Sequence, residues 1–202
     1  APAQGISPGD LPKDGYRLPG GIEPVLQLRT YYFDQQSLTG VASTAWTLGG
    51  WAGLRTPWIG EAVQLGVVGY TSQRLYGPAD EGGTLLLQTN QDPINVVGLA
   101  WGALRVAGQT FAAYRQLIDR PFINPQDNRM VPNPFEAYTL SGSIAKSFSY
   151  TSGYIAKIKN RDAEKFVSMS KDAGGSGDNE GLYFAGVDWD FMKNGRLRAD
   201  YQ

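Results

Sequence analysis

The chain contains no cysteine and no histidine among its 202 residues. Without these side chains it has no thiol nucleophile, no imidazole base and no Ser-His-Asp triad, and nearly all zinc sites are excluded. The absence of cysteine also fits an oxidising compartment outside the cytosol. We therefore expect a protein that is not an enzyme and that holds neither a metal ion nor a cofactor.

Long apolar runs and an excess of basic charge are also lacking. No run of about 18 apolar residues occurs, which excludes a transmembrane helix but leaves membrane-spanning strands possible. The net charge is -1, which argues against a nucleic-acid partner because such binding needs a basic face. The first residues carry no basic and apolar leader, as expected of a secreted protein after its signal peptide has been removed.

What the sequence does contain is typical of a β-rich protein: 26 glycines and 12% aromatic residues. Residues 1–20 hold four prolines and four glycines without periodicity, and we expect an irregular N-terminal segment there. From residue 21 onward the pattern has a period of two, which indicates strands. Nine are expected, at 23–34, 43–55, 61–71, 95–105, 110–119, 136–146, 148–160, 182–191 and 196–202.

Each expected strand has an apolar face and a small or polar face. In the first, Leu26 and Leu28 alternate with Gln27 and Arg29. In the fourth, Val97, Leu99, Trp101 and Ala103 are expected to share the apolar face. In the seventh, Tyr150, Tyr154, Ala156 and Ile158 are expected to oppose Lys157 and Lys159. The facing of the fifth strand is ambiguous, because Arg115 has the same parity as the apolar Phe111.

The connections between these strands alternate in length. TPWIG, AGQ, KSF and KNG are short, whereas the stretches before residues 96, 135 and 182 are long and polar. Short periplasmic turns, longer external loops and strands of about ten residues with one apolar side are typical of transmembrane β-barrels. Only a closed barrel pairs every strand amide in hydrocarbon. A soluble β-sandwich or ligand-binding barrel also alternates, but it turns its apolar side inward.

The segment 122–138 is too polar for a buried strand and too rich in proline for an open linker. Within it, PFINPQDNRMVPNPFE followed by TLSGSIAK resembles the corresponding stretch of OprD-type outer-membrane porins, and LQLRTYYF is similar to the first strand of that family. The resemblance follows the strand order of the whole chain. The DNRM core carries most of its specificity.

This resemblance implies an all-β, antiparallel transmembrane barrel of 18 strands with a loop folded inward as a constriction. The nine expected strands, residues 21–202, would form the N-terminal part of one barrel domain, half of a protein of roughly 400 residues. Carried over to matching positions, Asp127 and Arg129 would lie in the constriction with Arg29 as a partner on the wall. The polar faces add predicted lumen charges at Arg55, Lys157, Lys159, Asp188, Asp190, Arg196 and Arg198.

The function that this implies is passive diffusion of small hydrophilic solutes, such as carboxylates or amino acids, across the outer membrane of a Gram-negative-type envelope. Outer-membrane lipid and the solutes are the expected partners, and a protein partner stays open. Two alternatives also stay open: a barrel sleeve that insulates a partner such as an electron-transfer protein, and a soluble β-rich ligand-binding protein. The sleeve needs an empty lumen, so the path of the loop after Asp119 distinguishes it from a porin.

Overall fold

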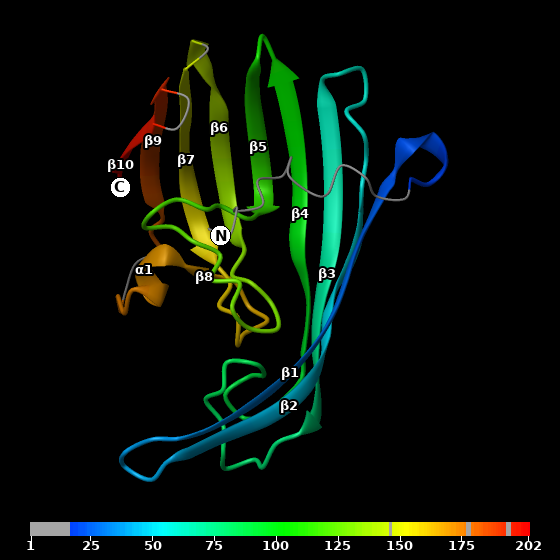
Figure 1. Ribbon diagram of the computed structural model, residues 1–202, viewed down its shortest axis with the longest axis vertical. Coiled ribbons are helices and arrows are strands. Elements are labelled where there is room, and N and C mark those ends of the chain that lie inside the picture. The colour runs from blue at the N-terminus through cyan, green and yellow to red at the C-terminus, as the bar shows by residue number, and fades with distance from the viewer. Residues whose placement is uncertain (1–16, 146, 177–178, 193–194) are drawn as a thin grey trace.

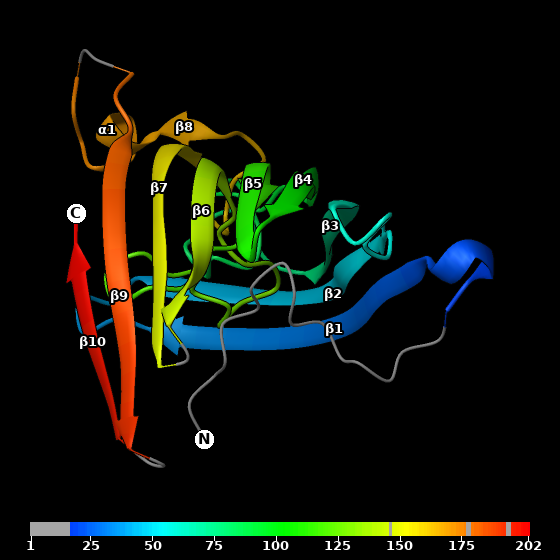
Figure 2. The ribbon, with the colours of Figure 1, turned by 90° about the horizontal axis from the view of Figure 1, so that it is seen from above.

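The computed structural model describes residues 17–145, 147–176, 179–192 and 195–202, and these form one curved antiparallel sheet (Figures 1 and 2). Neighbouring strands follow the chain in the order β1-β2-β3-β4-β5-β6-β7-β9-β10, and the short β8 pairs with β7. The strands are β1 (Glu23–Gln36), β2 (Ala42–Arg55), β3 (Val63–Tyr76), β4 (Ile94–Val106), β5 (Gln109–Gln116), β6 (Phe135–Ala145), β7 (Phe148–Ile158), β8 (Val167–Ser168), β9 (Leu182–Met192) and β10 (Gly195–Tyr201).

This architecture confirms the all-β antiparallel prediction. Each of the nine expected segments coincides with a strand, and only the two-residue β8 was not expected. The described helices are the 3-10 turn η1 (Pro19–Gly21) and the single turn α1 (Met169–Asp172). No helix in the described ranges has the length and apolar character needed to cross a membrane. Most of the expected irregular segment 1–20 lies outside the described residues.

The connections 56–62 and 107–108 lie at the opposite end of the sheet from the long connections, and the five-residue hairpin 37–41 lies at the same end as the long ones (Figure 1). Ala107 and Gly108 alone join β4 to β5, and both have positive φ, 49° and 77°. Two consecutive residues with positive φ form the type I′ turn that matches the twist of a hairpin. The long connections 77–93, 117–134 and 159–181 lie at the other end, which in membrane barrels is the external one.

The apolar faces of the strands are on the outside of the curved sheet. Leu26 and Leu28 are 80% and 77% exposed, whereas Thr47 and Ser72 on the concave face are fully buried. Burial of apolar side chains drives the folding of soluble proteins, so a continuous exposed apolar face requires a lipid solvent. This arrangement contradicts the soluble ligand-binding alternative.

A β-bulge in β4 reverses the predicted facing of part of that strand. Val68 pairs with Leu99 and the next residue, Gly69, pairs with Val97, so the register shifts at Gly98. Val97 therefore faces outward as expected, but Leu99 lies on the concave face. Trp101 and Ala103 follow Leu99 inward and are buried. An extra residue in one strand changes the parity of everything beyond it, which a period-two pattern does not register.

A second bulge, in β7, changes the predicted face of Lys157. Ala137 pairs with Ile155 and Glu136 pairs with Lys157, so the shift falls at Ala156. Ile155 is consequently buried on the concave side, and Lys157 stands on the convex face with Glu136.

Pairing also resolves the facing of β5. Phe111 pairs with Leu104 and Leu140, both exposed on the convex face, while Ala112 and Gln116 are buried on the concave face. Arg115 has the parity of Phe111 and is convex; its charge is neutralised by Glu136, with 3.1 Å between Nε and Oε1.

The buried core lies inside the curve of the sheet rather than between two layers. Two of the long connections fold over the concave face and supply apolar side chains to it: Leu86 and Leu87 from 77–93, and Met130 and Val131 from 117–134. These pack against wall residues such as Tyr70. The core therefore fixes both loops against the inner wall of β1–β5.

Candidate functional site

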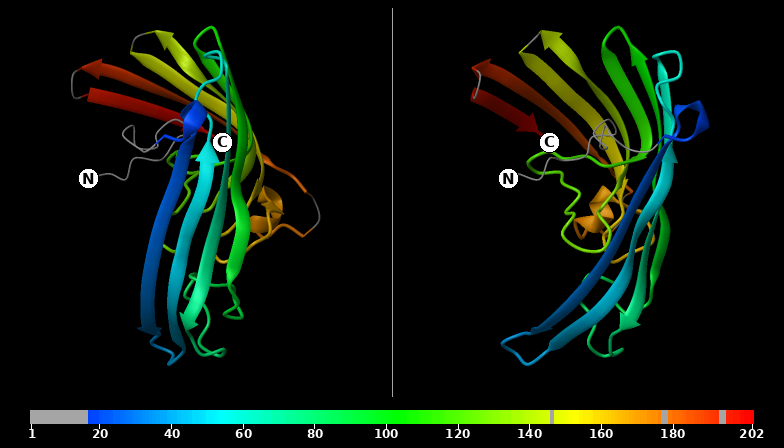
Figure 3. Two further views of the ribbon diagram at one scale, coloured as in Figure 1. Left: turned by 90° about the vertical axis from the view of Figure 1, so that its right-hand side faces the viewer. Right: turned by 45° about the vertical axis from the view of Figure 1, so that its right-hand side comes forward.

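The connection 117–134, which we call the inner loop, lies within the curve of the sheet, whereas α1 lies on the other side of the wall (Figure 3). Two backbone contacts shape it. Arg120 N donates to Ile123 O at 2.7 Å, and Asn133 N donates to Pro125 O at 2.7 Å, which closes residues 125–133 into a compact lobe. Met130 and Val131 are fully buried beneath this lobe. The inner loop is thus a shaped element and not an open linker.

The middle of the inner loop is attached to β1 through Asp127. Arg29 Nη1 and Nη2 donate to the two carboxylate oxygens of Asp127 at 2.6 and 2.8 Å, and Nη1 also donates to Arg129 O at 2.9 Å. The guanidinium stacks on Trp51, 4.1 Å from the ring centre. A bidentate pair of this kind fixes orientation as well as distance. The structure therefore brings together the three residues predicted for the constriction, Asp127 through its carboxylate and Arg129 through its backbone carbonyl.

The first residues of the inner loop are attached, through Arg120, to β9 and β10 at the opposite edge of the described sheet. Arg120 Nε donates to Asp200 Oδ1 at 2.6 Å, and its Nη1 donates to Asp188 Oδ2 at 2.8 Å. Asp188 also accepts from Arg198 Nε at 2.6 Å. Burial opposes the charged form of Arg120, but the two carboxylates outweigh it and the pKa of Arg120 is raised.

A glycine makes the second attachment possible. A Cβ built on Gly186 would overlap the Arg120 guanidinium and also approach Asp200. Gly186 pairs with Asp200 across β9 and β10 and is two residues from Asp188 on the same face of β9. Any larger side chain at this position would therefore displace Arg120. The segment 120–127 of the inner loop consequently spans the concavity from β1 to β9 and β10 and is held by an ion pair at each of these two residues.

Arg129 is not the partner of Asp127. Its Nε donates to Thr84 O at 3.1 Å, and its guanidinium carbon lies 5.0 Å from the centre of the Phe33 ring. No carboxylate forms an ion pair with it in the described part of the chain. The pKa of Arg161 is lowered, first by the burial of Arg161 and then by the positive charge of nearby Arg129. Arg129 is therefore a cation without an acidic neutraliser at the surface of the inner loop.

The other predicted lumen charges fall into three situations. Arg196 pairs with Asp190 at 2.6 Å on the concave face of β9 and β10, beside the pair that Arg198 makes with Asp188. Arg55 is buried at the end of β2 and donates through Nε to Glu23 at 3.0 Å. Contrary to the prediction, Lys157 is on the convex face and Lys159 is fully buried, so neither faces the lumen.

Lys159 directly follows the last residue of β7, and its side chain is buried. Its Nζ donates to Asn160 O at 2.9 Å and to Ala163 O at 3.2 Å, and its backbone N donates to Pro134 O. Burial lowers the pKa of Lys159 to about 8, against the opposing effects of Asp162 and Glu164. This lysine joins the base of the inner loop to the next connection.

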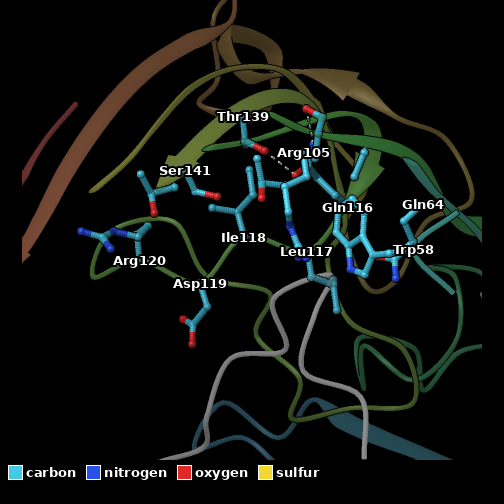
Figure 4. Close-up of a pocket in the computed structure, with 14 residues that line it drawn as sticks. Trp58, Gln64, Arg105, Gln116, Leu117, Ile118, Asp119, Arg120, Thr139 and Ser141 are labelled. Atoms are coloured by element: carbon cyan, nitrogen blue, oxygen red, sulfur yellow. Dashed lines mark hydrogen bonds between the residues drawn. The ribbon is translucent and has the colours of Figure 1, made fainter. Parts of the chain in front are cut away.

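A cavity of about 260 Å³ lies between the first residues of the inner loop and the concave wall (Figure 4). The residues that line it include Trp58, Arg105, Gln116, Asp119, Arg120 and Ser141. The Arg105 guanidinium stacks on Trp58 at 3.8 Å, and Gln116 accepts from Thr139 at 2.9 Å. The lining is therefore mixed and polar, as expected of a hydrated lumen and not of an apolar ligand site.

Arg120, Asp200 and Gly186 were missed as site residues. Arg120 stands 68 and 80 residues before its two carboxylate partners, and it belongs to the segment just before the recognisable DNRM core. The one signal that could have found it is the unusual grouping of three acidic residues on the polar faces of the last two strands, which calls for a cation from elsewhere.

An antiparallel wall with an apolar outer face, a charged inner face and a long connection folded inward defines a membrane β-barrel of the porin class. The model of the OprD family of outer membrane porins matches residues 21–201, and the chain belongs to this family. The OprD porins are outer-membrane proteins of Gram-negative bacteria, which places the chain in that membrane.

Solved porin structures share the fold at low sequence identity. A BenF-like porin from Pseudomonas fluorescens Pf-5 superposes with a TM-score of 0.76 at 20% identity, covering 89% of this chain and 48% of the porin. Acinetobacter baumannii OccAB2 gives 0.73 at 21% identity, with 86% and 47% covered. OpdK from Pseudomonas aeruginosa, solved with vanillate, gives 0.70 at 17% identity, with 86% and 46% covered. The chain thus spans about half the length of these structures. Comparison with curated protein sequences finds no match.

Proposed function

We propose that the protein is a passive channel in which the inner loop narrows a water-filled lumen through which small hydrophilic solutes diffuse. The observation that carries this proposal is the double attachment of the loop, to Arg29 on β1 and to Asp188 and Asp200 on β9 and β10. A loop fixed at two separated points of the wall has to cross the space that the wall encloses. No bond is made or broken, and selection depends on size and charge at the narrow section.

Small carboxylates and amino acids are the solutes that we propose. Arg129 is a fixed cation without a carboxylate partner among the described residues. Its Nε and Nη1 donate to Thr84 O and Asn128 O, so a solute carboxylate would be attracted by the charge and would accept from Nη2. Asp188, Asp190 and Asp200 on the concave face are each paired with arginine, so they repel an anion little. The similar porin OpdK was solved with vanillate, which is itself a carboxylate.

The alternative of a sleeve around an electron-transfer protein requires a lumen wide enough for that partner. The inner loop and the connection 77–93 both occupy the concave side and bury Met130 and Leu86 there. This argues against a sleeve and for a channel.

The test is ion selectivity of the complete protein in planar lipid bilayers. We expect a conducting channel whose preference for anions falls about two- to fivefold in Arg129→Ala, since one charge near a narrow section contributes roughly 1 kcal/mol. Lys171→Ala removes the same charge from α1, outside the lumen, and serves as the matched control. Unchanged selectivity in Arg129→Ala would remove Arg129 from the solute path, and the absence of conductance would overturn the channel itself.

A further inference from the structure

Three charged residues form a row on the convex face, the side of the wall that faces lipid. Arg115, Glu136 and Lys157 pair directly across β5, β6 and β7. Glu136 bridges its neighbours, with 3.1 Å to Arg115 Nε and 3.2 Å to Lys157 Nζ. We call these three residues the convex row. It contains two positive charges and one negative charge, and the Lys157 side chain is 48% exposed.

The position of the convex row along the strands is set by the tyrosines beside it. Tyr138 follows Glu136 by one outward position on β6, and Tyr154 precedes Lys157 on the outward face of β7. Tyr183 of β9 pairs with Tyr154, and their ring centres are 4.7 Å apart. Tyrosine belts mark the interface between hydrocarbon and headgroups. The convex row therefore lies at headgroup level, immediately beyond the hydrocarbon.

The leaflet follows from the connections. The convex row is at the ends of β5, β6 and β7 that lead to 117–134 and 159–181, the long connections. Long connections are external in outer-membrane barrels, so the row faces the outer leaflet. Charges on the lipid-facing side are costly except where they reach polar headgroups.

The convex row is supported from outside by the connection 159–181. The Phe166 ring stacks on the Arg115 guanidinium at 4.2 Å, and Glu164 accepts from the backbone N of Asn95 on β4 at 2.7 Å. This holds the segment against the convex face and covers one side of Arg115. Lys165, exposed between these two anchors, adds another positive charge beside the row. Arg115 Nη1 also donates to Val97 O at 2.8 Å, so the donors that remain are those of Lys157 and the Nη2 of Arg115.

We propose that the convex row binds a phosphate group of an outer-leaflet lipid headgroup. Arginine and lysine bind phosphate through charge-assisted hydrogen bonds, and the aromatic belt beneath them accommodates the acyl chains of the same lipid. Glu136 holds the two cations in place and at the same time competes with the phosphate for them. This site is independent of solute passage, because it stands on the opposite face of the wall from the inner loop.

The test is lipid binding by the complete protein in detergent, measured by native mass spectrometry with lipid A and with the same lipid after removal of its phosphates. We expect Lys157→Gln to weaken binding of lipid A about fivefold, since a basic residue at a charged surface contributes roughly that factor. Glu136→Gln should strengthen binding, because it removes the competing carboxylate. Lys171→Gln, which removes a positive charge elsewhere in the same connection, should leave binding unchanged.

Four results would overturn this site. The first is equal binding of lipid A to wild type and Lys157→Gln. The second is equal binding of the phosphorylated and dephosphorylated lipids to the wild type. A loss in Lys171→Gln as large as that in Lys157→Gln would reduce the effect to general surface charge. Displacement of the lipid by millimolar inorganic phosphate would contradict a lipid ligand, because the acyl chains are held by the tyrosine belt.

Discussion

Removing the guanidinium of Arg120 should release the first part of the inner loop and widen the channel. In Arg120→Ala the loop loses its contacts at 2.6 and 2.8 Å with Asp200 and Asp188, while Arg29 still holds Asp127. Breaking a buried ion pair costs about 3–5 kcal/mol. Asp188 keeps Arg198 as a partner, so the lower figure applies.

A change of about 3 kcal/mol shifts the balance between docked and released loop roughly 100-fold. States that are rare in the wild type should then appear in recordings of single channels as larger and more variable conductance. Arg196→Gln is the matched control, because its pair with Asp190 is exposed on the same wall and does not touch the inner loop. If Arg120→Ala folds and conducts with the amplitude and noise of the wild type, the attachment does not position the loop.

Two further predictions concern positions around the inner loop. Gly186→Ala should reproduce the conductance change of Arg120→Ala, because the new Cβ would overlap the Arg120 guanidinium. Gly69→Ala is the control and should behave as wild type, because its Cβ would meet nothing closer than 3.7 Å. Equal conductance of the two glycine variants would contradict the close packing of Arg120 against Gly186. Lys159→Met should abolish the pH dependence of the protection of the connection 159–181 from limited proteolysis, because it removes the amine whose pKa burial lowers from 10.5 to about 8. The variant also loses the hydrogen bonds of Nζ to Asn160 O and Ala163 O, so the pH profile and not the level of protection is the measurement. In the wild type, protection from proteolysis should rise with pH between about 8 and 10.5, because in that interval the opened segment binds more protons than the folded one. In Lys159→Met the protection should not change with pH over the same interval. A wild type whose protection does not change there would contradict the burial of the Lys159 charge.

The architecture was accessible from the sequence because a wall that separates lipid from water imposes a period of two on every strand. Nine strands and the rhythm of their connections follow from that constraint alone. The two errors of facing arise at Gly98 and Ala156, where a single extra residue changes the parity. Neither bulge leaves a mark in the alternation of residue types, because small residues such as these are accepted on both faces of the wall.

The site was less accessible because its contacts are distant in sequence. Asp127 and Arg29 are 98 residues apart, and their proximity was expected only through the resemblance of the DNRM segment to a known family. Arg120 carries no motif, and its role depends on a glycine in β9 and on two carboxylates in different strands. The burial of Lys159 was also not predictable from the alternation, because a charged residue at the end of a strand can be buried instead of facing water.

The central claim is that the inner loop narrows the lumen, and a single cysteine at its exposed surface tests it most directly. These 202 residues contain no cysteine, so Asn128→Cys adds one thiol to them, and Leu38→Cys in the hairpin between β1 and β2 is the control outside the lumen, each in a protein otherwise free of cysteine. Treatment with a bulky charged thiosulfonate during single-channel recording should reduce the conductance of Asn128→Cys in one irreversible step and leave Leu38→Cys unchanged. Labelling of Asn128→Cys without any change in conductance would contradict the claim.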